Sequence, residues 1–269
     1  AGDLDVGGGG VLTAGTGTFI FNGASVLTSS GTAFANIQVG DNVSGGALTT
    51  ADSLDVNGSV SVGTGGATAF DITDDGIYFS GDVDLRGLGS LVSTDATVYF
   101  DGASAQDIWS AGLDYNDLVV TNAGDEVRFQ DAFTAQDFTD ATAGSRLRFR
   151  ENTTFTIEGA LTLEGGAGSE ISIDSVNATD RFAFQLTSAQ VVSHVNVRNS
   201  EVLAASAGID IVADESIAGA NTDELEGSPH WVFAKFFSGR VYSDEGLTPV
   251  GAGETVVLHI DGTLYTTTT

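Results

Sequence analysis

An acidic turn around position 75 carries the residue types with the clearest potential for chemistry. Asp71, Asp74 and Asp75 lie together in Asp-Ile-Thr-Asp-Asp-Gly, which ends at Gly76. Carboxylate oxygens on a turn are the hard ligands that Ca²⁺ takes in proteins. The segment lacks the alternating spacing and terminal Glu of a helix-loop-helix calcium loop, and it is not the nonapeptide of calcium β-rolls. We therefore predict these three aspartates as calcium candidates in a chain that otherwise needs no cofactor, with plain solvation of the surface as the alternative.

A second acidic cluster follows the first along the chain. Asp82 and Asp84 alternate, so they would share one face of a strand, and Arg86 lies on the same stretch. Paired carboxylates near a cation are what the hydrolysis or elimination of a polysaccharide requires. Trp109 and Tyr115 are the nearest aromatic side chains that could hold a sugar. A carbohydrate-active enzyme or a carbohydrate-binding module is thus the alternative function, whereas the abundance of Asp favours a protein that is not an enzyme.

Three arginines form a stripe further along the chain. Arg146, Arg148 and Arg150 alternate with Leu147 and Phe149, which places the cations on one face of a strand and the apolar side chains on the other. In so acidic a chain, these arginines either pair with acids on neighbouring strands or meet an acidic patch of a partner. We favour the internal pairing.

The elements that must position these residues are short strands. Three-residue patterns with apolar ends recur throughout, for example Leu54–Val56, Val60–Val62, Ile77–Phe79 and Leu161–Leu163. Asn-Gly, Asp-Gly and Ser-Gly steps between them supply the positive φ that corners need. Such brevity is typical of a parallel β-solenoid, and we expect an all-β chain in which residues 11–233 form about ten coils over about 45 Å. Repeats of a β-sandwich are the alternative fold, because they use the same turns.

Two phrases in the chain are nearly identical. Thr-Phe-Ile-Phe-Asn-Gly-Ala-Ser at 18–25 returns as Thr-Val-Tyr-Phe-Asp-Gly-Ala-Ser at 97–104, and Phe-Ala-Asn-Ile-Gln-Val at 34–39 returns as Tyr-Asn-Asp-Leu-Val-Val at 115–120. This pattern predicts an internal duplication of about 11–90 and 91–170 within the solenoid. A Gly-rich segment, 1–10, precedes it.

The pattern of apolar and polar residues changes after residue 233. Longer apolar alternation appears in Thr255-Val-Val-Leu-His-Ile260, and we interpret 234–269 as a partial or docking β-segment too small to bury a core of its own. We expect Val241, Val256, Leu258 and Ile260 to serve in assembly, by adding a strand to a neighbouring sheet.

The composition excludes several partners. The 269 residues carry 37 acids against nine Lys and Arg, a formal charge of −28. Nucleic acid and anionic lipid would be repelled by such a surface. No stretch is apolar enough to predict membrane insertion. The absence of Cys leaves burial and strand ladders as the sources of stability.

The combination of Thr-Phe-Ile-Phe-Asn-Gly at 18–23, Ala-Asn-Ile-Gln-Val at 35–39 and Leu-Asp-Val-Asn-Gly-Ser-Val-Ser-Val at 54–62 resembles the strand repeats of large bacterial surface proteins of the filamentous-haemagglutinin and autotransporter-passenger kind. The segments at 238–246 and 255–262 look like the opening strands of an immunoglobulin-like module. The resemblance implies an extracellular or cell-surface rod: a structural part of a fibre or giant adhesin. Its partners would be copies of itself, neighbouring domains or a surface polysaccharide.

Overall fold

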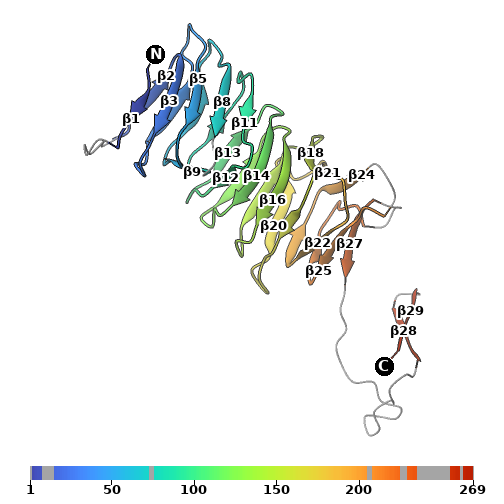
Figure 1. The fold of residues 1–269 in the computed structure, drawn as a ribbon. Coiled ribbons are helices and arrows are strands. Elements are labelled where there is room, and N and C mark those ends of the chain that lie inside the picture. The colour runs from blue at the N-terminus through green and yellow to red at the C-terminus, as the bar shows by residue number, and fades with distance from the viewer. Residues whose placement is uncertain are drawn as a thin grey trace. The chain divides into compact units, whose positions relative to one another are not determined.

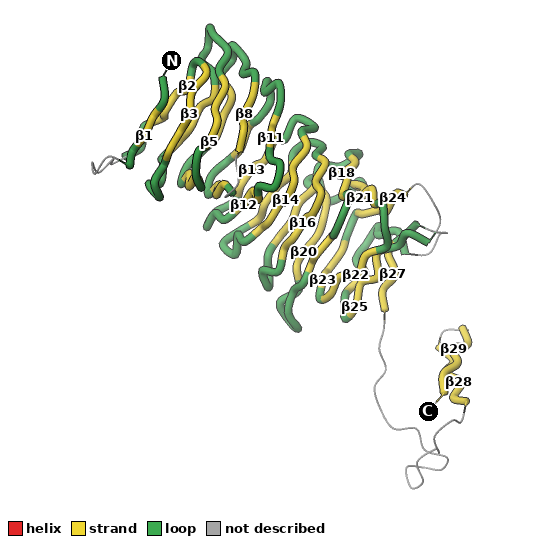
Figure 2. Tube along the Cα trace, in the orientation of Figure 1, coloured by secondary structure: helices red, strands yellow, loops and turns green. Residues whose placement is uncertain are grey.

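A parallel β-solenoid of about 10 coils forms the main unit of the chain (Figure 1). The computed structural model describes residues 2–7, 15–72, 76–204, 208–224, 229–234, 255–260 and 263–268; for 234, 255–260 and 263–268 it describes the backbone alone. Strands and loops account for these residues, and no helix occurs among them (Figure 2). Every ladder between strands in residues 2–234 is parallel, which confirms the predicted solenoid over the sandwich alternative.

The strands stack into sheets that run along the solenoid, so that each strand within a sheet pairs with strands of the coils before and after it, and the strands at its ends have one partner. The ten-stranded sheet runs in the order β2 (Thr18–Phe21), β4 (Asn36–Val39), β7 (Val60–Val62), β10 (Val83–Asp84), β13 (Gln106–Trp109), β15 (Glu126–Phe129), β17 (Arg146–Phe149), β20 (Ile171–Ser175), β23 (Val195–Val197) and β26 (Ile217–Ala218). The nine-stranded sheet contains β6 (Leu54–Val56), β9 (Ile77–Phe79), β12 (Thr97–Phe100), β14 (Asp114–Val120), β16 (Thr134–Asp140), β18 (Thr154–Ile157), β19 (Leu161–Leu163), β21 (Phe182–Leu186) and β24 (Ser200–Ala204).

Two smaller sheets complete the coils. The five-stranded sheet contains β1 (Leu4–Asp5), β3 (Ala24–Thr28), β5 (Ala47–Thr50), β8 (Ala69–Ile72) and β11 (Leu91–Val92). The three-stranded sheet contains β22 (Gln190–Ser193), β25 (Ile211–Asp214) and β27 (Trp231–Ala234).

The core is a continuous stack of inward side chains. Along each strand the buried and the more exposed positions alternate, because successive side chains of a strand point to opposite faces. Phe149 is fully buried at the centre of a phenylalanine cluster, with ring centroids 5.2 Å from Phe129, 4.7 Å from Phe182 and 5.0 Å from Phe155. One apolar core therefore joins the coils along the solenoid.

The two related phrases occupy different sheets. The first copy pairs β2 with β4 in the ten-stranded sheet, with Thr18 opposite Asn36. The second pairs β12 with β14 in the nine-stranded sheet, with Thr97 opposite Asp117. The matched positions have the same register, so each copy builds the same two-coil ladder, although the copies are not a whole number of coils apart.

The remaining strands belong to a second compact unit, residues 235–269. There β28 (Thr255–Ile260) and β29 (Thr263–Thr268) form an antiparallel pair in which Leu258 lies opposite Tyr265.

Candidate functional site

The predicted calcium site is only partly within the described residues. Asp71 lies on β8, where its neighbours on the adjacent coils are Thr49 and Val92, and neither of these supplies a carboxylate. Asp74 and Asp75 lie outside the described residues. In the part of the chain that the structure describes, no three acidic or histidine side chains gather as a metal site would need. The calcium site therefore stays a prediction.

Each residue of the predicted saccharide-cleaving cluster has a partner within the protein. Asp84 forms an ion pair of 2.6 Å with Arg86, and the hydrogen bond from this arginine lowers the pKa of Asp84. The Arg86 guanidinium also lies 4.8 Å from the centre of the Trp109 ring. Asp82 accepts a hydrogen bond from the backbone N–H of Asp107.

Tyr115 is not a surface platform for a sugar. Its ring is 4 % exposed and packs edge-on against Phe133, and its hydroxyl donates to Ser110 Oγ at 3.1 Å. Burial raises the pKa of this phenol, in accordance with its position in the core. The suggestion that Tyr115 could hold a sugar on the surface is therefore wrong: the residue faces inward, because it occupies a buried position of β14.

The arginine stripe pairs with acids on neighbouring coils, as predicted. Arg148 on β17 contacts Glu126 on β15 at 3.2 Å and Asp174 on β20 at 2.8 Å, so it joins three coils. Glu126 also pairs with Arg128, whose guanidinium lies 3.6 Å from Asp107. Burial raises the pKa of Glu126, but hydrogen bonds from Arg128 and Arg148 outweigh it and hold that pKa below its usual range.

This ladder continues through the buried amide of Asn199 and the exposed amide of Asn221 toward the C-terminal coils of the solenoid. Asn199 donates to Asp174 at 2.6 Å, and Asn221 donates to Asn199 at 3.0 Å. Arg181 in turn donates from Nε to the side-chain and backbone oxygens of Asn221, at 3.1 and 2.8 Å. The contacts form one polar network from Asp107 to Arg181, and we call it the polar network.

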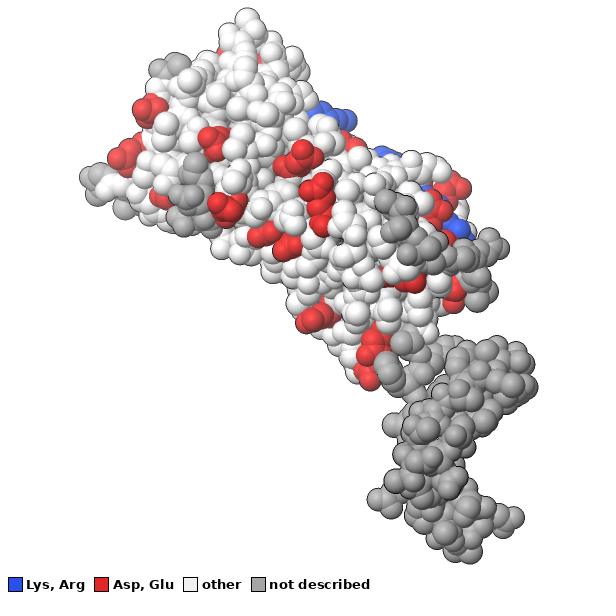
Figure 3. All heavy atoms as spheres, turned by 45° about the vertical axis from the view of Figure 1, so that its right-hand side comes forward, with Lys and Arg blue, Asp and Glu red and all other residues white. Residues whose placement is uncertain are grey.

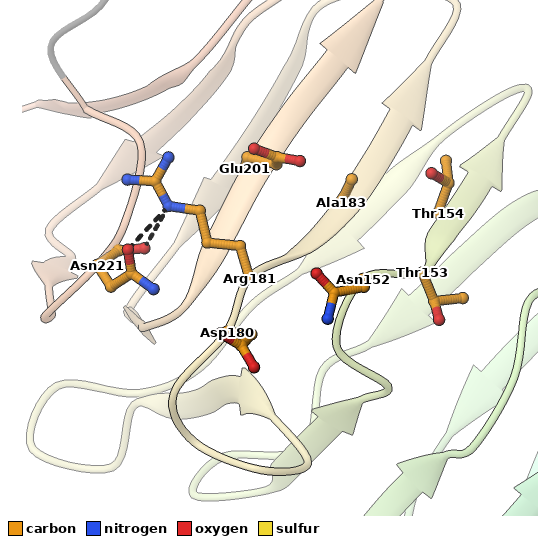
Figure 4. Close-up of a pocket in the computed structure, with 8 residues that line it drawn as sticks. All are labelled: Asn152, Thr153, Thr154, Asp180, Arg181, Ala183, Glu201 and Asn221. Carbon is orange, nitrogen blue, oxygen red and sulfur yellow. Dashed lines mark hydrogen bonds between the residues drawn. The ribbon is translucent and has the colours of Figure 1, made fainter.

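A groove opens where the polar network ends. Its volume is about 700 Å³, and it is lined by Asn152, Thr153, Thr154, Asp180, Arg181, Ala183, Glu201 and Asn221 (Figure 4). Asn152 and Asn221 on its rim have φ values of 55° and 59°, a left-handed conformation that Asn tolerates better than most residues. The lining side chains come from β18, β21, β24 and the loops that precede and follow these strands. We call this concavity the Ala183 groove.

A second unusual group lies inside the coils. Asp140 is fully buried at an inward position of β16, between Val120 and Leu163 of the adjacent coils. Its carboxyl accepts from the Thr142 N–H at 2.8 Å and contacts the Ser145 hydroxyl at 2.5 Å. Burial raises the pKa of Asp140 to about 6, although both hydrogen bonds oppose the rise.

Like-charged carboxylates lie on neighbouring coils of the nine-stranded sheet. Asp117 is directly opposite Asp137, and burial together with the charge of Asp137 raises the pKa of Asp117. Burial and the charge of Asp101 raise the pKa of Asp55 in the same way. Figure 3 shows acidic side chains spread over the visible face of the solenoid, with the basic ones gathered along one margin. The surface therefore holds carboxylates that repel each other.

The predicted assembly residues belong to the second unit. Val241 lies outside the described residues, while Val256, Leu258 and Ile260 lie on β28, opposite Thr267, Tyr265 and Thr263 of β29. Among the described residues, no helix has the length and apolar character to cross a membrane. Comparison of the chain with family models, with curated proteins and with solved structures gives no match.

Proposed function

We propose that this chain is a non-enzymatic structural rod, a stalk within an extracellular surface fibre or giant adhesin. The observation that carries the proposal is the single apolar core that joins about 10 parallel coils. Each coil is fixed to the next by hydrogen bonds along the strands and by stacked side chains, an arrangement that resists bending at any one point. At about 4.8 Å per coil, the ten-stranded sheet gives a rod about 45 Å long. The extracellular location rests on the resemblance to surface proteins.

The strand edges support assembly as part of this function. Among the described residues, β2 and β26 end the ten-stranded sheet with one partner each, and β28 and β29 pair only with each other. Open edges take up further strands, and a two-stranded hairpin is marginally stable in water without another partner. If the hairpin adds a strand to the sheet of another copy, or of a neighbouring domain, the open sheet edge and the hairpin each gain a hydrogen-bonding partner.

Electron microscopy of the purified chain in negative stain, with and without millimolar calcium, tests the proposal. We expect regular fibres from the full chain, and single short rods with an unchanged circular dichroism spectrum after deletion of 236–269. Fibres that persist after this deletion would refute the role of the C-terminal unit. Compact particles without an elongated axis would refute the rod itself.

A point substitution refines this test. Leu258→Asp places a charge on the apolar side predicted from the alternation of β28, whereas Val257→Asp places the same charge on the opposite side of that strand. Assembly through the side that holds Val256, Leu258 and Ile260 predicts loss of fibres in the first variant and their retention in the second. Equal loss in both would contradict the assignment of that side.

A further inference from the structure

The floor of the Ala183 groove is an alanine between two longer residues. On the outer face of the nine-stranded sheet, Thr154, Ala183 and Glu201 are neighbours on three successive coils. Ala183 occupies the position between the inward Phe182 and Phe184, and it is only 4 % exposed. The hollow over this short side chain has a volume of about 700 Å³, which is within the range of about 300–1,000 Å³ for small-molecule sites.

Several hydrogen-bonding groups of this groove have no partner among the described residues. Arg181 uses Nε for Asn221, which leaves Nη1 and Nη2 free. The Glu201 carboxylate and the Asn152 side-chain amide make no hydrogen bond or ion pair within the described residues. Donors and acceptors thus stand within one concavity, on elements that the sheet holds in place (Figure 4).

The chemistry of the lining excludes several classes of ligand. A divalent cation would meet the fixed charge of Arg181, and a polyanion would meet Asp180 and Glu201 on a molecule with a net charge of −28. An apolar ligand would find Ala183 as the only hydrophobic residue of the lining within the described part of the chain. Vicinal hydroxyl groups suit the site, because each hydroxyl both donates and accepts and can bridge a guanidinium and a carboxylate.

We propose that the Ala183 groove binds a neutral sugar unit of a polysaccharide. The polar network prepares the site, since Arg181 is already held by Asn221, which is fixed through Asn199 to the buried Asp174. A side chain that is ordered before binding loses less conformational entropy on binding. Among the described residues, the lining has no aromatic ring on which a sugar could stack, so we expect an affinity for one unit in the millimolar range.

Nuclear magnetic resonance tests this proposal, with the ¹⁵N-labelled chain carrying Leu258→Asp if the parent forms fibres. The probes are cello-, malto-, manno- and galacto-oligosaccharides, with oligogalacturonate as the charged comparison. We expect at least one neutral oligosaccharide to shift the backbone amides of Asn152, Arg181 and Glu201 with millimolar saturation. No shift of these amides with any neutral probe, or stronger binding of oligogalacturonate than of every neutral probe, would overturn the proposal.

Two variants and one control complete the experiment. Ala183→Leu fills the hollow and Glu201→Gln keeps the shape while it removes a charged acceptor, so each weakens the affinity about tenfold or more. Gln185→Leu adds a leucine to an exposed position of the same strand outside the groove and leaves the affinity unchanged. If Ala183→Leu changes the midpoint of urea unfolding, its fold is affected, and the affinity of Glu201→Gln alone then tests the site. Unchanged binding in Glu201→Gln together with a folded, binding Ala183→Leu would refute the site. The rod proposal is independent of this result, because it is measured by particle shape.

Discussion

The buried carboxyl of Asp140 makes the stability of the solenoid depend on pH. Its pKa rises from the ordinary 3.8 to about 6 in the folded chain, so the folded state prefers the protonated acid. Below pH 3.8 both states are protonated and folding is not penalised. Between pH 3.8 and about 6 the unfolded chain releases this proton while the folded chain keeps it, so stability falls as the pH rises; above 6 both states are ionised and the full loss, about 3 kcal/mol from this difference in pKa, has been reached.

Asp140→Asn removes this penalty without loss of contacts. An amide in the same place accepts from the Thr142 N–H and donates to the Ser145 hydroxyl, the two partners of the carboxyl. We expect the variant to be more stable than the parent by about 3 kcal/mol at pH 8 and by only about 0.5 kcal/mol at pH 4. Urea unfolding, followed by the fluorescence of the buried Trp231, measures both differences.

The control for this experiment is a surface acid. Asp114→Asn changes the net charge equally but at an exposed position at the start of β14, so it should leave the urea midpoint nearly unchanged at both pH values. The reasoning is refuted if Asp140→Asn is destabilised at pH 8, or if its gain is the same at pH 4 and pH 8.

Four further predictions concern the polar network, the core, the charged surface and calcium. Arg148→Met leaves two largely buried carboxylates without their shared partner and should lower the free energy of unfolding by about 3 kcal/mol, whereas Arg86→Met, in a more exposed pair, should lower it by less than about 1 kcal/mol. Phe149→Ala empties the centre of the phenylalanine cluster and should cost about 3–5 kcal/mol in urea unfolding, against less than about 1 kcal/mol for Ile20→Ala, whose side chain is 52 % exposed. Raising NaCl to about 1 M should increase the melting temperature, because salt screens the repulsion between surface carboxylates; a decrease would mean that attraction within the polar network dominates. Calorimetric titration with calcium should show binding that Asp71→Asn weakens, and an identical titration of parent and variant would exclude Asp71 from any site.

The sequence predicted the strands whose inward positions are strongly apolar. Leu54–Val56, Ile77–Phe79 and Leu161–Leu163 are strands of the structure as the pattern indicated. The five-stranded sheet escaped prediction: Ala24–Thr28 and Ala47–Thr50 are rich in Ala, Thr and Ser, and Leu4–Asp5 and Leu91–Val92 have only two residues each. These strands form because both neighbouring coils supply hydrogen-bonding partners, a tertiary effect that overrides weak local propensity.

The Ala183 groove could not be predicted for a related reason. Its residues come from separate segments between 152 and 221, which only the fold brings together. Only Arg181, a rare cation in an acidic chain, was a signal that could have drawn attention to it. The arginine stripe was predicted correctly, since strict alternation along one strand fixes which side chains share a face.

Two related sequence segments, 18–39 and 97–120, pair in the same register in different sheets of the solenoid. The two sheets can therefore accept the same sequence pattern. Phe19 lies opposite Ile37 in one sheet, and Val98 lies opposite Leu118 at the matching positions of the other. The contact between the two coils is thus formed by the residues of the segment itself and does not depend on the sheet that contains it. Each coil of a solenoid contacts mainly its neighbours, so a two-coil segment can be duplicated at a new position without substitutions in distant coils. A chain of this kind can change its length by recombination while its interior stays packed.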